Sequence, residues 1–418
     1  MKKSKEIIII GGGIVGLCTA YFLNKSGHQV SIIDKSDFTD NCSYGNAGMI
    51  VPSHFIPLAA PGVITQGLKW MFNPESPFQI NPQLNANFFK WIWEFYKASN
   101  TKRVNKAIPV LKELNTASLA LYKSLSESEE FNFQLNEKGL LMYFKTDKAF
   151  ENEKHVAEKA ITLGLKTDII SGTEVGKFET EIDLSVIGAI HFKSDACFTP
   201  QYFMKEIINV LKTRGIKFIE NTAIEKFDFK GNVLKSVRSN NNTFEADEFV
   251  LATGSWTGRL AKELNIQIPM LPGKGYSFEI ETQKVKPKIC AILTEAKVAV
   301  TPMENGLRFA GTMELGAFNS KINQKKIDGI LKSIPKYFPQ LSKNDFENIK
   351  IWSGLRPCSP DGLPFIGKSK GFNNLTIAAG HAMMGMSLGP ISGKLVTEII
   401  NEEKPGIDLS LLAVDRFS

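Results

Sequence analysis

The chain has 418 residues, of which 43% are hydrophobic and 22% are charged, and its formal net charge is +7. These proportions are ordinary for a folded globular protein, and they exclude a disordered chain, a collagen-like repeat and a coiled coil. A polytopic membrane protein is also excluded, because no stretch of ~20 uninterrupted apolar residues follows the N-terminus.

The N-terminus resembles a secretion signal, because Met1–Lys5 is basic and Ile7–Leu23 is largely apolar. The apolar run nevertheless holds four glycines, and no small-x-small cleavage site follows it. We therefore expect a strand over Ile7–Ile10 that is buried on both faces, a glycine-rich turn over Gly11–Gly16, and then a helix. A second strand is expected over His28–Ile33.

The turn has the spacing Gly-x-Gly-x-x-Gly, in which each glycine has its own role. Gly11 permits the tight turn, Gly13 lets the backbone approach a pyrophosphate at the positive end of the helix, and Gly16 lets that helix pack close to the strand. Asp34 ends the second strand, where its carboxylate can accept hydrogen bonds from a ribose hydroxyl. Together these features predict a dinucleotide site.

The chain does not continue with alternating strands and helices, as a nicotinamide dehydrogenase would. A polar loop, Asn41–Met49, is followed by a long region with many prolines and aromatic residues, and elements of the nucleotide fold return later. These expected elements are a helix at Phe203–Arg214, strands at Ile216–Ile219 and Thr222–Phe227, a hairpin of Val233–Arg238 and Thr243–Glu245, buried strands at Glu248–Gly254 and Leu375–His381, and a helix at Gly389–Asn401.

The chain resembles the D-amino acid oxidase superfamily of flavoproteins, and most closely the branch of D-amino acid dehydrogenases and bacterial hydroxyproline-pathway dehydrogenases. The segments that carry the resemblance are Gly11–Gly16 with Asp34, Gly45–Met49, Ala252–Trp256, Pro272–Ser277, Gly354–Pro357, Asp361–Gly367 and Gly380–Gly385. The resemblance implies an α/β fold, α+β overall, with a Rossmann-like FAD-binding domain interleaved with an antiparallel-sheet substrate domain that covers the flavin ring.

The implied domains alternate along the chain. The FAD-binding domain takes residues 1–85, 196–270 and 351–418, and the substrate domain takes 86–195 and 271–350. Five segments have the pattern expected of the substrate sheet: Gly139–Phe144, Gly188–Phe192, Tyr276–Ile280, Val298–Pro302 and Gly306–Ala310. The last two flank Met303–Asn305, a natural hairpin turn.

The resemblance also implies a set of substrate residues. Arg356 pairs with the carboxylate of an amino acid, because a planar guanidinium binds both oxygens at once. Tyr276 donates its hydroxyl to the same carboxylate, walls the pocket, or is an ordinary sheet aromatic. Lys274 lies near the flavin or the carboxylate, or is a solvated turn lysine. Met49 touches the flavin or packs in the core, and His54 is a further candidate for the border of the pocket.

The implied cofactor is FAD, and no metal site is expected. The loop of His381 runs under the flavin pyrimidine, so we assign this histidine to cofactor binding and not to general-base catalysis. The whole cofactor set is Gly11, Gly13, Ile14, Val15, Gly16, Asp34, Lys35, Asn46, Ala47, Gly48, Ile224, Ala252, Thr253, Gly254, Trp256, Gly380, His381, Met384 and Gly385. Some relatives attach FAD to a cysteine, but that position falls near Gly354 and not at Cys358, so we expect non-covalent FAD.

The implied reaction is the oxidation of a D-amino acid by hydride transfer from Cα to flavin N5. D-proline or cis-4-hydroxy-D-proline is the expected substrate, because Gly380–Leu388 resembles the hydroxyproline-pathway branch and has no charged residue apart from His381. A glycine- or sarcosine-type oxidase that reduces oxygen is one alternative. A non-catalytic flavin subunit of a larger complex is another, against which the retained motif of Arg356 argues.

The partners follow from the same resemblance and from the composition. A quinone or another component of an electron-transfer chain is the expected electron acceptor. The aromatic segment Phe88–Tyr96, which follows Leu68–Phe72, is interpreted first as part of a helix pair packed on the flavin domain and second as a membrane-facing patch. Five widely spaced cysteines without a Cys-x-x-Cys pair favour the cytoplasm, with peripheral contact on the inner face of the membrane as an alternative. No nucleic-acid partner is expected, and no oligomeric state is predicted.

Overall fold

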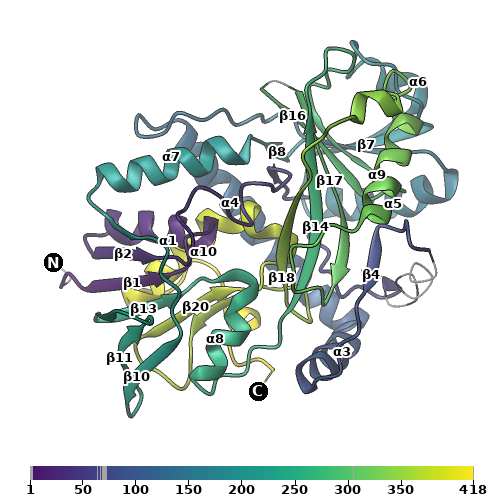
Figure 1. The fold of residues 1–418 in the computed structure, drawn as a ribbon. Coiled ribbons are helices and arrows are strands. Elements are labelled where there is room, and N and C mark those ends of the chain that lie inside the picture. The colour runs from purple at the N-terminus through teal and green to yellow at the C-terminus, as the bar shows by residue number, and fades with distance from the viewer. Residues whose placement is uncertain (1–2, 64, 66, 68–72, 305, 418) are drawn as a thin grey trace.

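Two large sheets organise the chain in the computed structural model, which describes residues 3–63, 65, 67, 73–304 and 306–417. One sheet is mostly parallel and lies on the left of Figure 1, and the other is mostly antiparallel and lies on the right. Each is built from segments far apart in the sequence. This arrangement confirms the predicted fold class.

The first sheet has the strand order β19-β20-β13-β1-β2-β9. Its strands are β1 (Glu6–Ile10), β2 (Gln29–Ile33), β9 (Lys217–Ile219), β13 (Glu248–Leu251), β19 (Phe365–Lys368) and β20 (Leu375–Ala379). All neighbours are parallel except β19, which runs antiparallel to β20. The four isoleucines of β1 are buried because both faces of the sheet are covered. Ile7 and Ile9 pack in a cluster with the surrounding helices, whereas Ile8 and Ile10 pack in a cluster with Phe227, Leu234 and Val237.

Helices α1 (Ile14–Lys25), α7 (Pro200–Thr213) and α10 (Gly385–Ile400) pack around this first sheet (Figure 1). α1 and α10 approach closely at Gly393, where a Cβ atom would lie 2.5 Å from the backbone carbon of Cys18. α10 begins at Gly385, the last residue of the glycine-bearing turn and four residues before the predicted Gly389. The long helix α4 (Thr101–Ser126) also joins this core, where the hydroxyl of Tyr122 donates to the carbonyl of Met386 at 2.6 Å.

The second sheet has the order β18-β14-β17-β16-β15-β5-β7-β6, with β4 beside β17. Its strands are β4 (Phe78–Ile80), β5 (Leu140–Phe144), β6 (Thr167–Ser171), β7 (Gly188–Phe192), β14 (Leu271–Ile280), β15 (Cys290–Leu293), β16 (Val298–Met303), β17 (Gly306–Leu315) and β18 (Trp352–Cys358). Two pairs, β5–β15 and β4–β17, are parallel, and the rest are antiparallel. Helices α5 (Asp147–Thr162), α6 (Gly172–Val175) and α9 (Gln324–Tyr337) lie against it (Figure 1).

Several boundaries differ from the prediction. β18 and β4 belong to the second sheet, although they fall in 351–418 and 1–85, which the resemblance assigned to the FAD-binding domain. Conversely, α4 covers the first sheet, although it falls in 86–195, which was assigned to the substrate domain. The strand predicted at Thr222–Phe227 is β10 (Lys226–Lys230), because the preceding residues leave the sheet to line a cavity. Asn305, in the predicted hairpin turn, lies outside the described residues.

Two small sheets complete the fold. β10 pairs with β11 (Val233–Arg238), and β11 with β12 (Thr243–Glu245), which gives the predicted hairpin. β3 (Met49–Ile50) pairs antiparallel with β8 (Ala196–Cys197). Helix α8 (Thr257–Glu263) follows the turn after β13.

Helix α3 (Ala86–Ala98) carries the aromatic segment and has two different faces. Phe88 and Trp91 are buried against the β14, β17 and β18 end of the second sheet and against Ala382. The contacts with Cys358 and Ala382 fall in the range 351–418 that was assigned to the flavin domain, on which the helix was expected to pack. The opposite face exposes Phe89, Trp93 and Tyr96 by 59%, 58% and 64%. The preceding Leu68–Phe72 lies outside the described residues. Within the described ranges, no helix is long and apolar enough to cross a membrane.

Candidate active site

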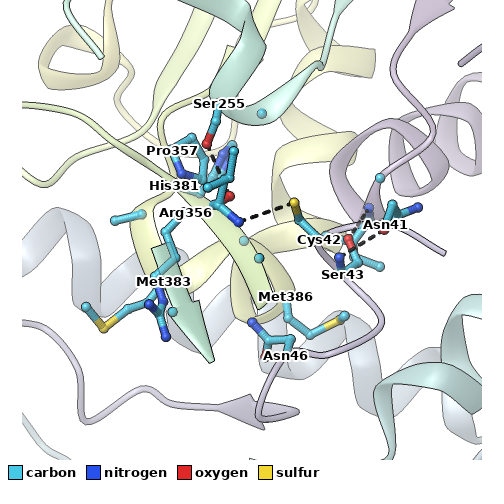
Figure 2. A pocket seen from close by; sticks show the side chains of 18 of the residues that line it. Asn41, Cys42, Ser43, Asn46, Ser255, Arg356, Pro357, His381, Met383 and Met386 are labelled. Atoms are coloured by element: carbon cyan, nitrogen blue, oxygen red, sulfur yellow. Dashed lines mark hydrogen bonds between the residues drawn. The ribbon is translucent and has the colours of Figure 1, made fainter. Parts of the chain in front are cut away.

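A cavity of about 1010 Å³ lies where the two sheets meet. Residues directly after the carboxyl ends of β1, β2 and β13 line one part of it, which is where parallel sheets bind their ligands. Strands β14, β17 and β18 line another part. Figure 2 shows the cavity from close by, with Asn41, Cys42 and Ser43 on one side and Arg356 and His381 on another.

The glycine turn at the start of α1 has the room that a phosphate needs. Gly13 is the N-cap of α1, no side chain caps the helix, and a Cβ atom there would meet only the Ser43 hydroxyl at 3.6 Å. Gly11 has φ +111° and lies against Ala252, so it permits the sharp turn. A Cβ atom on Gly16 would lie 1.9 Å from the carbonyl of Gly11, so this glycine packs the helix on the strand and does not line the cavity. The open helix start is suited to an anion.

Asp34 lies beside the turn and organises it. Its Oδ2 accepts from the amide of Gly12 at 2.6 Å, and its Oδ1 accepts from the amide and hydroxyl of Ser36 at 2.8 and 2.7 Å. A carboxylate has about four acceptor positions, so capacity for one further donor remains toward the cavity. The neighbouring Lys35 places its ammonium 3.5 Å from the ring centroid of Trp256, and both residues line the cavity.

The loop that follows is fixed by helix α1 and by the second sheet. The Ser43 hydroxyl accepts from the amide of Ile14 at 3.1 Å, and the Cys42 thiol accepts from the amide of Leu355 at 3.4 Å (Figure 2). From the second sheet, Arg308 donates through Nη1 to the carbonyls of Tyr44 and Asn46 at 3.0 and 2.6 Å.

Two hydroxyls of the second sheet add to these anchors. Ser277 donates to the carbonyl of Gly45 at 2.8 Å, and Thr301 donates to the carbonyl of Ala47 at 2.7 Å. Asn46, Ala47 and Met49 are thereby held at the cavity wall, whereas Gly48, with φ +74°, packs against Phe198 and Pro200 instead.

Arg356 extends from β18 into the cavity, where it is a cation without an acidic partner among the described residues. Its Nη1 donates to the carbonyl of Thr312 at 2.7 Å, and no carboxylate of the described residues forms an ion pair with it. The guanidinium lies over Gly275, where a Cβ atom would be 1.9 Å from Nη1. Burial lowers the pKa of Arg356, but a guanidinium stays charged at neutral pH. An unneutralised cation in a cavity favours the binding of an anion.

Tyr276 and Lys274 take part in a separate buried network. The Tyr276 hydroxyl donates to Glu314 and accepts from the amide of Asn323 at 3.0 Å, so it is already committed, and only the body of Tyr276 walls the cavity. Lys274 lies inside β14 and not in a turn; its ammonium donates to the carbonyl of Lys321 at 2.6 Å and faces Glu314 at 3.6 Å. Lys274 does not line the cavity, because these partners hold it on the Glu314 side.

His381 lines the cavity, but its ring is bonded away from it. Ser392 uses its proton to donate to the carbonyl of Leu388 at 2.7 Å, so its oxygen accepts from His381 Nε2 at 2.8 Å. Burial lowers the pKa of His381 to about 3, and the ring is therefore neutral at pH 7. Next to it, no side chain caps the start of α10 at Met384 and Gly385, and both residues line the cavity. Gly380, with φ +79°, packs on Phe365.

Most predicted site residues therefore meet in one cavity. Those that line it are Gly11, Gly13, Ile14, Val15, Asp34, Lys35, Asn46, Ala47, Met49, His54, Ile224, Ala252, Thr253, Gly254, Trp256, Tyr276, Arg356, His381, Met384 and Gly385. Gly16, Gly48, Gly380 and Lys274 do not.

No sequence pattern indicated the lining residues Cys42, Arg259, Lys297 and Thr312, or the loop anchor Arg308. They lie outside any glycine motif, so only alternation along β17 could have placed Arg308 and Thr312 on one face. Within the described residues, no cluster of three or more His, Cys, Asp or Glu side chains could hold a metal ion.

Comparison with known proteins agrees with this cavity. The family model described as FAD dependent oxidoreductase matches residues 6–399. A D-amino acid dehydrogenase of Granulibacter bethesdensis is 30% identical over 427 residues, covering 99% of this chain and 100% of that protein. A D-amino acid dehydrogenase of Helicobacter pylori is 28% identical over 396 residues, covering 94% of each.

Solved structures show the same fold. Glycine oxidase from Geobacillus kaustophilus has a TM-score of 0.77 at 19% identity, with 99% of both chains covered. L-proline dehydrogenase from P. horikoshii has a TM-score of 0.74 at 21% identity, covering 100% of this chain and 98% of that one. FAD is the cofactor of the family, and the open glycine turn, the acid after β2 and the long cavity fit it. The chain therefore belongs to the family of FAD-dependent oxidoreductases.

Proposed function

We propose that this protein is a dehydrogenase of D-amino acids, with D-proline or cis-4-hydroxy-D-proline as its preferred substrate. The observation that carries the proposal is Arg356, a cation without an acidic partner among the described residues, on the wall of the FAD cavity. A free amino acid supplies the missing carboxylate, which the guanidinium fork can bind through two parallel hydrogen bonds.

The shape of the site supports a compact, apolar substrate body. Met383, Met384 and Met386 line the cavity, and Phe78 and Met313 add apolar surface near Thr312, which binds Arg356. Methionine side chains are flexible and polarizable, so they pack well around a small ring. These apolar side chains carry no charge, and the lining Lys297 interacts with the buried Glu153, so we expect aspartate to be a poor substrate. The D-configuration is supported by the names of the relatives.

The chain's own residues contribute orientation and electrostatics. FAD supplies the redox chemistry when bound, by accepting a hydride from the substrate Cα. We propose that Gly13, Ile14 and Val15 hold its phosphates at the start of α1, and that the uncapped start of α10 stabilises negative charge on its ring. Arg356 then fixes the carboxylate, and positioning of this kind can account for several kcal/mol of a barrier.

The cofactor is proposed to be bound without a covalent link. Gly354, near the position where some relatives carry a cysteine, lines the cavity and has no thiol. The Cys358 thiol is buried, lies 4.0 Å from the sulfur of Met313, and is not among the lining residues. Acid precipitation should leave all the flavin in the supernatant, whereas flavin that stays with the protein would refute the non-covalent assignment.

A membrane quinone is the proposed electron acceptor, reached from the cytoplasmic side. All five cysteines are free thiols, which suits the cytoplasm. Phe89, Trp93 and Tyr96 form one exposed aromatic face on α3, and such faces insert at the boundary of a bilayer. Replacing all three by Ser should abolish flotation with lipid vesicles and preserve activity with a soluble dye. Phe229→Ser, at an exposed position of β10, is the control. Equal flotation of the wild type, the triple variant and Phe229→Ser would refute the proposed membrane contact of α3.

The substrate assignment is tested by comparing kcat/KM with an artificial dye. The panel contains both enantiomers of proline, 4-hydroxyproline, alanine and aspartate, together with glycine and sarcosine. We expect D-proline or cis-4-hydroxy-D-proline to lead, and slow reoxidation of the reduced enzyme in air. A preference for an L-enantiomer or for aspartate would refute the substrate assignment. Fast reoxidation in air with glycine or sarcosine as the best substrate would identify an oxidase, and inactivity with every member would favour a non-catalytic flavin subunit.

A further inference from the structure

A chain of three polar side chains leads from the cavity into the protein interior. Ser53 and His54 follow β3, and Asp195 directly precedes β8. Because β3 and β8 pair antiparallel, with Met49 opposite Cys197, the two ends meet. Ser53 and Asp195 are only 7% and 1% exposed and do not line the cavity, whereas His54 does.

The hydrogen bonds in this chain fix the direction of each donor. The amide of Ser53 donates to Asp195 Oδ1 at 3.0 Å, and the Ser53 hydroxyl donates to Oδ2 at 2.5 Å. Since the single hydroxyl proton is used there, the contact of 3.2 Å between Ser53 Oγ and His54 Nδ1 requires that Nδ1 carries the proton and donates. The neutral His54 ring then has a bare Nε2.

Nε2 is the end of the chain that a ligand can reach. Among the described residues, the Ser53 hydroxyl is the only hydrogen-bond partner of the His54 ring, and Nε2 is not one of the buried atoms left without a partner. The ring lines the cavity together with Met49, Met142 and Lys297. A hydrogen-bond acceptor is thus presented in the cavity that also holds Arg356.

The two ends of the chain differ in their affinity for a proton. Burial, together with the smaller effect of the Lys297 charge, lowers the pKa of His54 to about 4, so the imidazole does not retain a proton at pH 7. Burial raises the pKa of Asp195 to about 7, although the bonds from Ser53 oppose this. The buried carboxylate is therefore the stronger base of the two.

We propose that His54, Ser53 and Asp195 form a proton relay that deprotonates the ammonium group of the bound amino acid. The proposal rests on the proposed function, in which an amino acid becomes an imine. An ammonium nitrogen has no lone pair, so it must lose a proton before the Cα–H bond can break with formation of the C=N bond. His54 would be the catalytic residue that touches the substrate, and the other two act through it.

The relay step moves protons only and is balanced. An N–H bond of the ammonium breaks as the His54 Nε2–H bond forms, and the Nδ1–H bond breaks as a new Ser53 O–H bond forms. The original Ser53 O–H bond breaks as the Asp195 Oδ2–H bond forms. The substrate loses one positive charge, the carboxylate loses its negative charge, and His54 ends neutral in the opposite tautomer. After the product leaves, the reverse shifts along the same bonds release the proton from His54 Nε2 to solvent water that enters the cavity.

Among the described residues, few other titratable groups face the relay. Lys297, in the turn between β15 and β16, acts on His54, and Glu153 of α5 faces Lys297, with a pKa that burial raises. Cys290 on β15 is near Asp195, and its thiol stays protonated because burial and the neighbouring Cys197 raise its pKa well above the usual value. The pH dependence should therefore come from Asp195, the end of the relay.

The closing experiment measures the anaerobic rate of flavin reduction by D-proline between pH 6 and 10 in the holoenzyme. The wild type should reach a plateau above about pH 7, where Asp195 is ionised. His54→Ala and His54→Gln should be slower at pH 7 by about 10²–10⁴-fold, and their rates should rise with pH toward the pKa of the free substrate amine. Asp195→Asn should change the profile in the same direction.

Ser387→Ala is the matched control, because it removes a hydroxyl that accepts from the amide of Val51 in the same segment at 3.1 Å but leaves the relay intact. It should keep the wild-type pH profile, as a purely structural loss would. If His54→Ala also keeps that profile and only its overall rate falls, the relay is refuted while the proposed function stands. If no amino acid reduces the wild-type flavin, the proposed function fails, and the relay fails with it.

A second measurement does not depend on activity. Nitrogen NMR of histidine-labelled protein at pH 8 should show His54, assigned with His54→Ala, as a neutral ring protonated at Nδ1. Ser53→Ala should abolish this preference. A wild-type His54 protonated at Nε2 would contradict the hydrogen-bond directions on which the relay depends.

Discussion

The position of Arg356 depends on a glycine in the neighbouring strand, and this gives a sharp prediction for Gly275→Ala. A Cβ atom at residue 275 would lie 1.9 Å from Nη1 and 2.3 Å from Cζ and Nη2 of Arg356, with no backbone atom among its nearest contacts. Real Cβ atoms do not approach so closely, so the guanidinium must move. The strand itself can tolerate Ala, because Gly275 has no positive φ.

The expected cost falls on the substrate and not on folding. Loss of a buried, hydrogen-bonded charge pair costs about 2–5 kcal/mol, and a displaced guanidinium should forfeit the lower part of that range. We therefore expect kcat/KM for the D-amino acid to fall by about 30-fold or more, since about 1.4 kcal/mol corresponds to a factor of ten. FAD content and melting temperature should stay close to those of the wild type.

A double-mutant cycle makes the test specific. Gly275→Ala should have little further effect in an Arg356→Ala background, because the side chain that it displaces is absent there. Gly367→Ala, in strand β19 of the first sheet, is the control. A Cβ atom at this position would meet only Val414, at 3.8 Å. Equal losses from Gly275→Ala with and without Arg356, or a wild-type KM in the single variant, would refute the role given to this contact.

Three further predictions concern the anchor, the cofactor and the buried acid. Arg356→Ala should keep FAD and lose most activity in the dye assay. Arg356→Lys should recover only part of that activity, because an ammonium cannot match both carboxylate oxygens. A wild-type KM in Arg356→Ala would place the carboxylate anchor elsewhere. Gly13→Val should fold but fail to retain FAD, since its side chain would fill the space before α1, and normal flavin content in the purified variant would contradict this. The folded-state pKa of Asp195 is about 7, above its ordinary value. Between about pH 4 and 7 the native state therefore binds more protons than the unfolded state does. As a result, the free energy of unfolding falls as pH rises through that window. Denaturation of Asp195→Asn in parallel should lack this component of the slope, and equal slopes would show that Asp195 titrates as in the unfolded chain.

The sequence was informative where backbone geometry restricts the residue type. Gly11 and Gly13 could be assigned because a positive φ and an open helix start require glycine, and β1 because its four isoleucines suit only a strand covered on both faces. Arg356 came from its motif and from the resemblance. These features are local, so a short segment contains all the information needed.

The details that the sequence did not determine depend on contacts between distant segments. Tyr276 walls the cavity, as one of its expected roles had it, but Glu314, 38 positions further along the chain, holds its hydroxyl. Glu314 also faces the ammonium of Lys274, which does not line the cavity. In the same way, nothing in the sequence near His54 indicates Asp195, which β8 brings to it from 142 residues beyond Ser53. Which hydroxyl or carboxylate satisfies a buried polar group depends on the pairing of strands, and the local pattern does not contain it.

The central claim is that this FAD-dependent oxidoreductase oxidises a D-amino acid anchored by Arg356. It is tested most directly by anaerobic titration of the purified holoenzyme with each enantiomer of proline, following the visible absorbance of the flavin. We predict that D-proline bleaches the flavin of the wild type rapidly and that L-proline does not. Arg356→Ala should be bleached far more slowly at the same low concentration of D-proline, because the anchor changes the rate and not the stoichiometry. Faster bleaching by L-proline, or equal rates in the wild type and Arg356→Ala at that concentration, would contradict the account.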